Sequence, residues 1–89
     1  VIIGQMVLQA QHAQEYFQKG IKAFELKKWA EAQDLFTKVL EHKKTYTDAY
    51  YFRGRANYEL SEYNLALDDF MASVRNNPVD AEFHYWKGK

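Results

Sequence analysis

The sequence predicts an all-α fold built from tandem antiparallel helix hairpins. Glycines recur at intervals of 34 residues, at Gly20, Gly54 and Gly88, and apolar residues recur around them at steps of three and four. A fixed period of about 20 to 50 residues is typical of repeat proteins, and steps of three and four place apolar side chains on one face of a helix. Together the two observations predict repeated amphipathic helices.

Composition supports packed helices and narrows the classes of partner. Hydrophobic residues make up 47% of the 89 residues and there is one Pro, which favours a packed core over disorder. Twelve basic residues balance twelve acidic ones, so we expect no nucleic-acid partner. The apolar stretch 1–8 is shorter than the roughly 20 residues that span a bilayer, so we expect no membrane insertion. The compartment stays unknown, with the cytosol only a default.

The first predicted helix covers residues 5–26. Met6, Ala10, Ala13 and Phe17 keep the spacing of three or four residues through the region before the first repeat. We therefore interpret residues 1–12 as an N-terminal helical extension or cap.

Two full repeat units follow, at residues 13–46 and 47–80. The amphipathic pattern breaks near Lys27 and Lys28 and again near Ser61 and Glu62, which divides each unit into two helices. The remaining helices are expected at 29–43, 47–60, 63–76 and 80–88. Residues 81–89 begin a truncated third unit, so we expect the native chain to continue beyond Lys89.

The recurring glycines predict close contact between the two helices of each hairpin. A Gly inside a helix costs about 1 kcal/mol relative to Ala, so its recurrence needs a packing reason. Ala32 and Ala66, each twelve residues after a glycine, are expected to face Gly20 and Gly54. Larger side chains are expected to fill the wider gaps: Trp29, Tyr63, Phe36 and Phe70.

The second unit resembles the tetratricopeptide repeat. The residues that carry this pattern are Gly54, Tyr58, Tyr63, Ala66, Phe70 and Pro78. The resemblance covers residues 13–89, although the first unit has Lys44 where the second has Pro78. It implies hairpins stacked as a right-handed α-solenoid, whose first helices line a concave groove that binds a peptide or helix of a partner protein.

The resemblance also implies which residues border that groove: Phe17, Ile21, Tyr51, Arg55 and Tyr85. The alternative for any of these aromatics is burial, because rings at helical spacing are more often core than recognition surface. We expect Phe24 and Tyr58 in particular to pack inside the hairpins.

One known binding mode of the family does not fit. Members that capture the acidic carboxyl terminus of heat-shock chaperones use Lys, Asn and Arg at five positions. The corresponding residues in this chain are Phe17, Ile21, Phe52, Glu82 and Trp86. Because none of them matches, we expect no such carboxylate clamp.

Neither a catalytic nor a metal or cofactor site is predicted, so we expect no enzyme. His12, His42 and His84 are far apart in sequence and lack a carboxylate at ligand spacing. Asp68 and Asp69 are adjacent on a helix and are interpreted as a solvated face. The predicted function is a scaffold or adaptor that binds a protein or peptide. The alternative is assembly of a homo-oligomer through the apolar N-terminus and the incomplete third hairpin.

Overall fold

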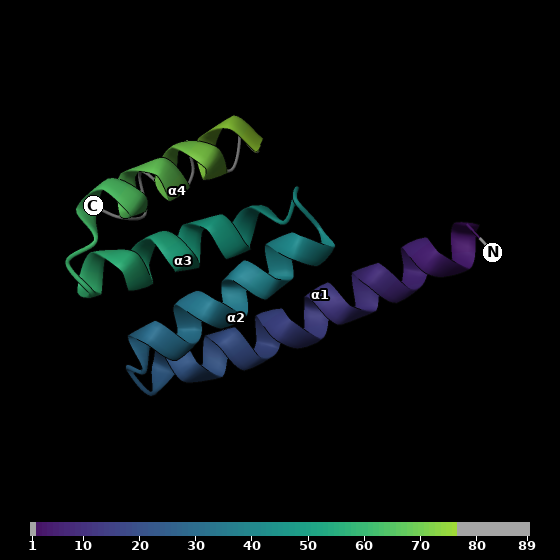
Figure 1. Ribbon diagram of the computed structural model, residues 1–89, viewed down its shortest axis with the longest axis horizontal. Coiled ribbons are helices and arrows are strands. Elements are labelled where there is room, and N and C mark those ends of the chain that lie inside the picture. Colours follow the sequence, from purple (N-terminus) through teal and green to yellow (C-terminus); the bar gives the residue numbers. More distant parts are fainter. Residues whose placement is uncertain (1, 77–89) are drawn as a thin grey trace.

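The computed structural model describes residues 2–76, which form four α-helices arranged as two hairpins (Figure 1). The first hairpin consists of α1 (Ile2–Glu25) and α2 (Trp29–His42), and the second of α3 (Thr47–Glu59) and α4 (Tyr63–Asn76). Helix α3 packs on α2 and thereby joins the hairpins. The all-α prediction and the four helices expected in this region are confirmed. The helix expected at 80–88 and the third unit at 81–89 lie outside the described residues.

The turn of the first hairpin is a Schellman motif, the common way to end a helix with a left-handed residue. Lys27 has a φ of 61°, and its N–H donates to the carbonyl of Phe24 at 2.9 Å. The N–H of Lys28 donates to the carbonyl of Ala23, also at 2.9 Å. These bonds pair two carbonyls that the end of α1 would otherwise leave unsatisfied. The break that the sequence predicts near Lys27 is confirmed.

The second hairpin turns in the same way, 34 residues later. Ser61 has a φ of 64°, its N–H donates to Tyr58 at 3.0 Å, and the N–H of Glu62 donates to Asn57 at 2.8 Å. The repeat therefore extends to the backbone geometry of the turns. Both left-handed positions carry a side chain, whose Cβ makes this backbone conformation less favourable than it would be for glycine.

Each described repeat glycine faces a phenylalanine ring. A Cβ built on Gly20 would lie 2.6 Å from Cε1 of Phe36, and one built on Gly54 would lie 2.8 Å from Cε1 of Phe70. Carbon atoms do not approach that closely, so each glycine makes room for a ring. The rings of Phe36 and Phe70, which we expect to fill the wider gaps, are thus the groups nearest the glycines, whereas the contact expected from Ala32 and Ala66 stays a prediction.

Three rings form the centre of the core, and one of them comes from the second hairpin. Phe36 is fully buried, and its ring centroid lies 5.6 Å from that of Phe17 and 6.0 Å from that of Phe52. Phe52 belongs to α3, so its ring anchors the second hairpin in the core of the first. Burying one such side chain stabilises the fold by about 1.5 to 3 kcal/mol.

Helix α1 extends past its partners at its N-terminal end (Figure 1). With 24 residues it is the longest described helix, and Val7 and Leu8 on this extension are about half exposed, at 53% and 50%. Within residues 2–76, none of the helices is both long and apolar enough to cross a membrane.

Candidate functional site

The first candidate surface centres on Arg55, an exposed residue of α3. Its guanidinium carbon lies 5.0 Å from the ring centroid of Phe24, 5.7 Å from that of Tyr51 and 6.0 Å from that of Phe52. A guanidinium within about 6 Å of a ring centroid is attracted by the negative face of the ring. Phe24 comes from α1 and the other rings from α3, so this aromatic platform bridges the two helices.

Arg55 has no charged partner in the part of the chain that the structure describes. The ion pairs found there are Lys38 with Asp34 and Arg53 with Asp69, and Nδ1 of His12 lies 3.7 Å from Oε1 of Glu15. None of the hydrogen bonds found in residues 2–76 involves Arg55 either, and the contacts found for its guanidinium there are with rings. A guanidinium carries five N–H donors, which are left to solvent or to a ligand.

The residues predicted to border the groove have different surroundings. Phe17 is half-buried, with its ring 4.9 Å from that of Tyr46 in addition to its contacts with the core. Ile21 is half-buried against the same core. Tyr51 is half-buried, with its ring 5.9 Å from that of Phe70. The structure thus brings Tyr51 and Arg55 together, whereas Tyr85 lies outside the described residues.

Two tyrosines that sequence reasoning placed inside the hairpins are exposed. Tyr58 and Tyr63 each expose 58% of their surface, and their rings meet edge to face at 5.3 Å. The prediction of burial is therefore wrong for both. The error follows from the pattern itself, because helical spacing shows which residues share a face but not whether that face is covered. Phe24 does pack, against Trp29 at 5.1 Å, and remains half-buried.

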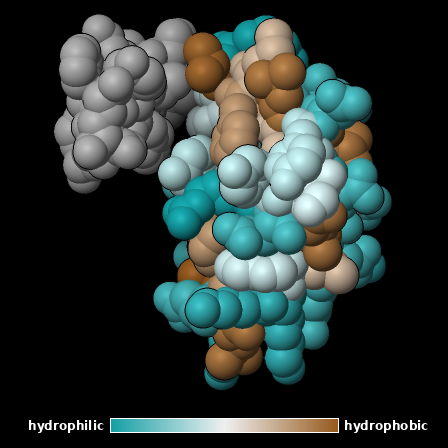
Figure 2. Space-filling view, turned by 90° about the vertical axis from the view of Figure 1, so that its left-hand side faces the viewer, coloured by the Kyte–Doolittle hydropathy of each residue, from teal (hydrophilic) through white to brown (hydrophobic). Residues whose placement is uncertain are grey.

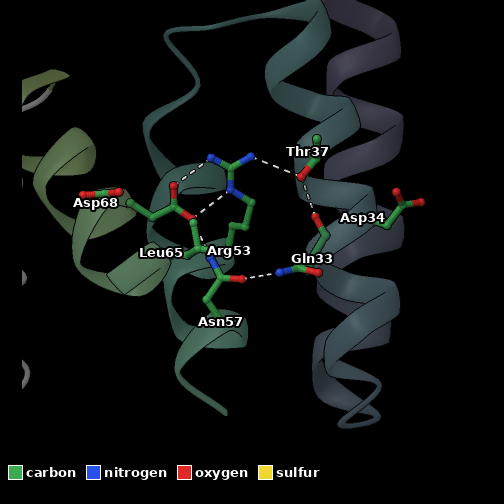
Figure 3. Close-up of a pocket in the computed structure, with 8 residues that line it drawn as sticks. Gln33, Asp34, Thr37, Arg53, Asn57, Leu65 and Asp68 are labelled. Carbon is green, nitrogen blue, oxygen red and sulfur yellow. Dashed lines mark hydrogen bonds and ion pairs between the residues drawn. The ribbon is translucent and has the colours of Figure 1, made fainter. Parts of the chain in front are cut away.

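The second candidate surface is a polar cleft of about 380 Å³ where α2, α3 and α4 meet (Figure 3). At its centre Arg53 binds Asp69 in a bidentate pair, with Nε donating to Oδ2 at 2.8 Å and Nη2 donating to Oδ1 at 2.7 Å. The carboxylates of Asp34 and Asp68 point away from Arg53 (Figure 3). The centre of the cleft is thus an ion pair within the protein.

Other side chains complete this polar network. Nη1 of Arg53 donates to Oγ1 of Thr37 at 3.1 Å, and Nδ2 of Asn57 donates to Oδ2 of Asp69 at 2.9 Å. Nε2 of Gln33 donates to Oδ1 of Asn57. In the described part of the chain no buried side-chain nitrogen or oxygen lacks a hydrogen-bond partner. A fully paired network of this kind fixes the arrangement of helices and offers few free groups to a ligand.

Asp69 corrects a prediction made from the sequence. It is 5% exposed and paired, not part of a solvated face, whereas its neighbour Asp68 is exposed. The hydrogen bonds from Arg53 to Asp69 raise the pKa of Arg53, burial opposes this, and the negative charge of Asp69 and the nearby Tyr50 add to the rise. The guanidinium therefore stays charged despite its partial burial.

One signal in the sequence could have revealed the network. Gln33 and Thr37 occupy the positions that Leu67 and Met71 hold in the second unit, and Asn57 stands where the first unit has Ala23. A polar residue in one repeat at a position that is apolar in the other suggests a role particular to that repeat. Comparison of the two units, position by position, would have singled out these residues.

His12 and His42, which are 30 residues apart in the sequence, lie close together in the structure. The ring centroid of His42 lies 5.6 Å from that of Tyr16 and 5.2 Å from that of His12, and Nδ1 of His42 shares a hydrogen bond with Oε1 of Gln9. Within residues 2–76 no three His, Cys, Asp or Glu side chains are grouped so that they could hold a metal ion. We interpret the pair as packing between α1 and α2.

The end of the molecule that carries both hairpin turns shows no single dominant patch. Figure 2 views it from that side, and brown hydrophobic and teal hydrophilic surfaces alternate there. Recognition by one broad apolar area is therefore not favoured on this face. Lys19 and Lys43 each lie over a single ring, of Tyr16 and Tyr46, whereas Arg55 has three rings from two helices around its guanidinium.

No protein-family model matches the chain, and no curated protein matches it.

Proposed function

We propose that this chain is a protein-interaction module of the tetratricopeptide kind, which binds a segment of a partner protein in the groove between α1 and α3. The observation that carries the proposal is the guanidinium of Arg55, which lies against rings from both helices and has no charged partner within residues 2–76. Arginine and aromatic side chains are the types that most often dominate binding energy at protein interfaces. The proposed role needs no catalytic group or cofactor.

The repeat geometry supports the choice of this groove. Two hairpins with matching turns, 34 residues apart, are joined through α2 and α3, while α1 and α3 meet through side chains, with the ring of Phe52 against those of Phe17 and Phe24. Rings and one cation therefore line the space between two first helices. If further hairpins followed in the same relation, they would form the right-handed α-solenoid that the resemblance implies.

The test compares a double variant with a control variant in pull-downs from the full-length protein. Tyr51→Ala combined with Arg55→Ala alters the proposed binding surface, whereas Asp68→Ala alters an exposed residue of α4 that lines the polar cleft. We expect a specific partner to be lost from the first variant and kept by the second, while both retain the helical circular dichroism of the wild type. A partner retained equally by both variants would move the function away from this groove.

A second candidate, assembly of a homo-oligomer, is favoured by a different surface. Leu67, Met71 and Val74 on α4 are 57%, 49% and 51% exposed, and their spacing places them on one helical face. Substitution of Leu67 and Met71 by Gln is expected to abolish any concentration-dependent rise in mass during sedimentation. A wild-type mass that stays monomeric at every concentration would exclude this candidate.

A further inference from the structure

The surroundings of Arg55 restrict what this surface can bind, if the proposed function holds. The rings of Phe24, Tyr51 and Phe52 all lie within 6.0 Å of the guanidinium carbon. Arg55 is exposed and takes part in none of the ion pairs or hydrogen bonds found within residues 2–76, so its N–H groups are available there for a bidentate ligand. A carboxylate has the matching geometry and the opposite charge.

The acidic residues of α3 do not satisfy this guanidinium. Glu59 lies one turn after Arg55 and Asp48 two turns before it, and both are exposed without forming an ion pair to Arg55. Arg followed by Glu four residues later is also the less favourable order for a pair along a helix. By contrast Arg53, only two residues away, forms a bidentate ion pair with the carboxylate of Asp69.

Aromatic residues flank Arg55 on both sides along α3. Tyr51 precedes it by one turn, and Tyr58, which is 58% exposed, follows it by about one turn. A bound segment that continued on both sides of its carboxylate could pack an apolar side chain towards each tyrosine. A chain ending at its carboxylate could use only one of them, so the site favours a side-chain carboxylate over a terminal one.

We propose that the partner presents an Asp or Glu side chain flanked by aromatic or aliphatic residues, and that this carboxylate binds Arg55. The inference rests on the proposed function and adds the chemical class of the bound segment. The binding is then expected to weaken with salt, because the pair lies at the surface where ions screen it.

The experiment uses a phage-displayed library of random peptides selected on the whole chain. Selected peptides are synthesised with blocked ends, so that no terminal carboxylate is present, and their affinities are measured by isothermal titration calorimetry. We expect selection for Asp or Glu beside apolar residues, and about a tenfold loss of affinity for the Gln or Asn version of the peptide. The Arg55→Gln protein should show a similar loss, and combining both changes should add little more.

Arg75→Gln provides the matched control, because Arg75 is an exposed arginine at the end of α4. It should bind the selected peptides as the wild type does. The selected peptides could instead lack acidic residues and bind Arg55→Gln but not Tyr51→Ala. That result would overturn this inference but support binding at the proposed surface. Failure to select any peptide, or binding that neither variant changes, would overturn both proposals.

Discussion

Arg53 and Asp69 form a bidentate ion pair between α3 and α4, with donor to acceptor distances of 2.8 and 2.7 Å. Thr37 extends this pair to α2, so a single guanidinium connects both hairpins. The side chains of Arg53 and Asp69 are 22% and 7% exposed. Water therefore competes weakly for the pair, and its loss should affect the junction between the hairpins.

Asp69→Asn is expected to lower the free energy of unfolding by about 3 kcal/mol, because it leaves a partly buried guanidinium without its counter-charge. Urea unfolding followed by circular dichroism would measure the change. Asp68→Asn is the control, since Asp68 is exposed, and should change stability by at most about 0.5 kcal/mol. Equal effects of the two variants would contradict the role of the pair.

Arg53→Met combined with Asp69→Leu should be less destabilising than the sum of the single substitutions. Replacing both charges by apolar groups removes the unpaired charge that each single variant leaves behind. A double-mutant cycle in urea would give the coupling free energy, expected to exceed about 1 kcal/mol. Simple additivity would show that the two side chains act independently.

Gly20→Ala is expected to destabilise the protein by about 1 to 2 kcal/mol, because overpacking against the buried ring of Phe36 outweighs the better helix propensity of Ala. Gly4→Ala is the matched control, since a Cβ on Gly4 would meet nothing within 4 Å. It should leave stability unchanged or raise it by up to about 1 kcal/mol. Thermal unfolding of the two variants would separate these outcomes.

Lys27→Gly is expected to stabilise the protein by about 0.5 to 1 kcal/mol, since glycine relieves the left-handed backbone conformation, partly offset by its extra freedom in the unfolded chain. Lys28→Gly is the control, because Lys28 has a φ of −89° and gains no such relief. It should lose stability instead. Changes of the same sign in both variants would argue against strain at Lys27.

Alkaline pH should destabilise the fold partly through Tyr46. Burial raises the pKa of Tyr46 above its ordinary value of 10.0, and the negative charge of Asp48 adds to the rise. The unfolded chain then loses the phenolic proton first, so this contribution is complete below pH 10.0 and is lost as the pH rises through the folded pKa.

The measurement is urea unfolding between about pH 9 and about pH 11, a range that brackets tyrosine titration. The free energy of unfolding should fall less steeply with pH in Tyr46→Phe than in the wild type. Asp48→Asn should give an intermediate slope, because it removes the smaller of the two causes. Parallel curves for Tyr46→Phe and the wild type would contradict the assignment.

The helices could be predicted from the sequence because their signals are local. Periodicity and turn breaks predict helices at 29–43 and 63–76. The structure has α2 at Trp29–His42 and α4 at Tyr63–Asn76. Each boundary depends on residues within one turn of it. The close packing that the recurring glycines predict is confirmed, and the group that approaches each of them is the ring of Phe36 or Phe70.

The contacts between hairpins could not be predicted in the same way. Whether Tyr63 or Asp69 is covered depends on how far a neighbouring helix lies from it, and that distance is not encoded in the periodicity of one helix. Arg53 and Asp69 are 16 residues apart, and the equivalent positions of the first unit hold Lys19 and Leu35, so no repeated pattern marks them. The platform beneath Arg55 likewise needs Phe24 from another helix.

The polar network also gives the two hairpins a fixed order. Gln33 and Thr37 on α2 supply groups that meet α3, whereas α4 carries Leu67 and Met71 at the equivalent positions. In a duplicate of residues 47–76 placed after α4, the arginine and asparagine would keep the duplicated aspartate, but they would face Leu67 and Met71 in place of Gln33 and Thr37. Duplication of this hairpin alone would therefore reproduce the ion pair but not the hydrogen bonds that tie it to the preceding helix.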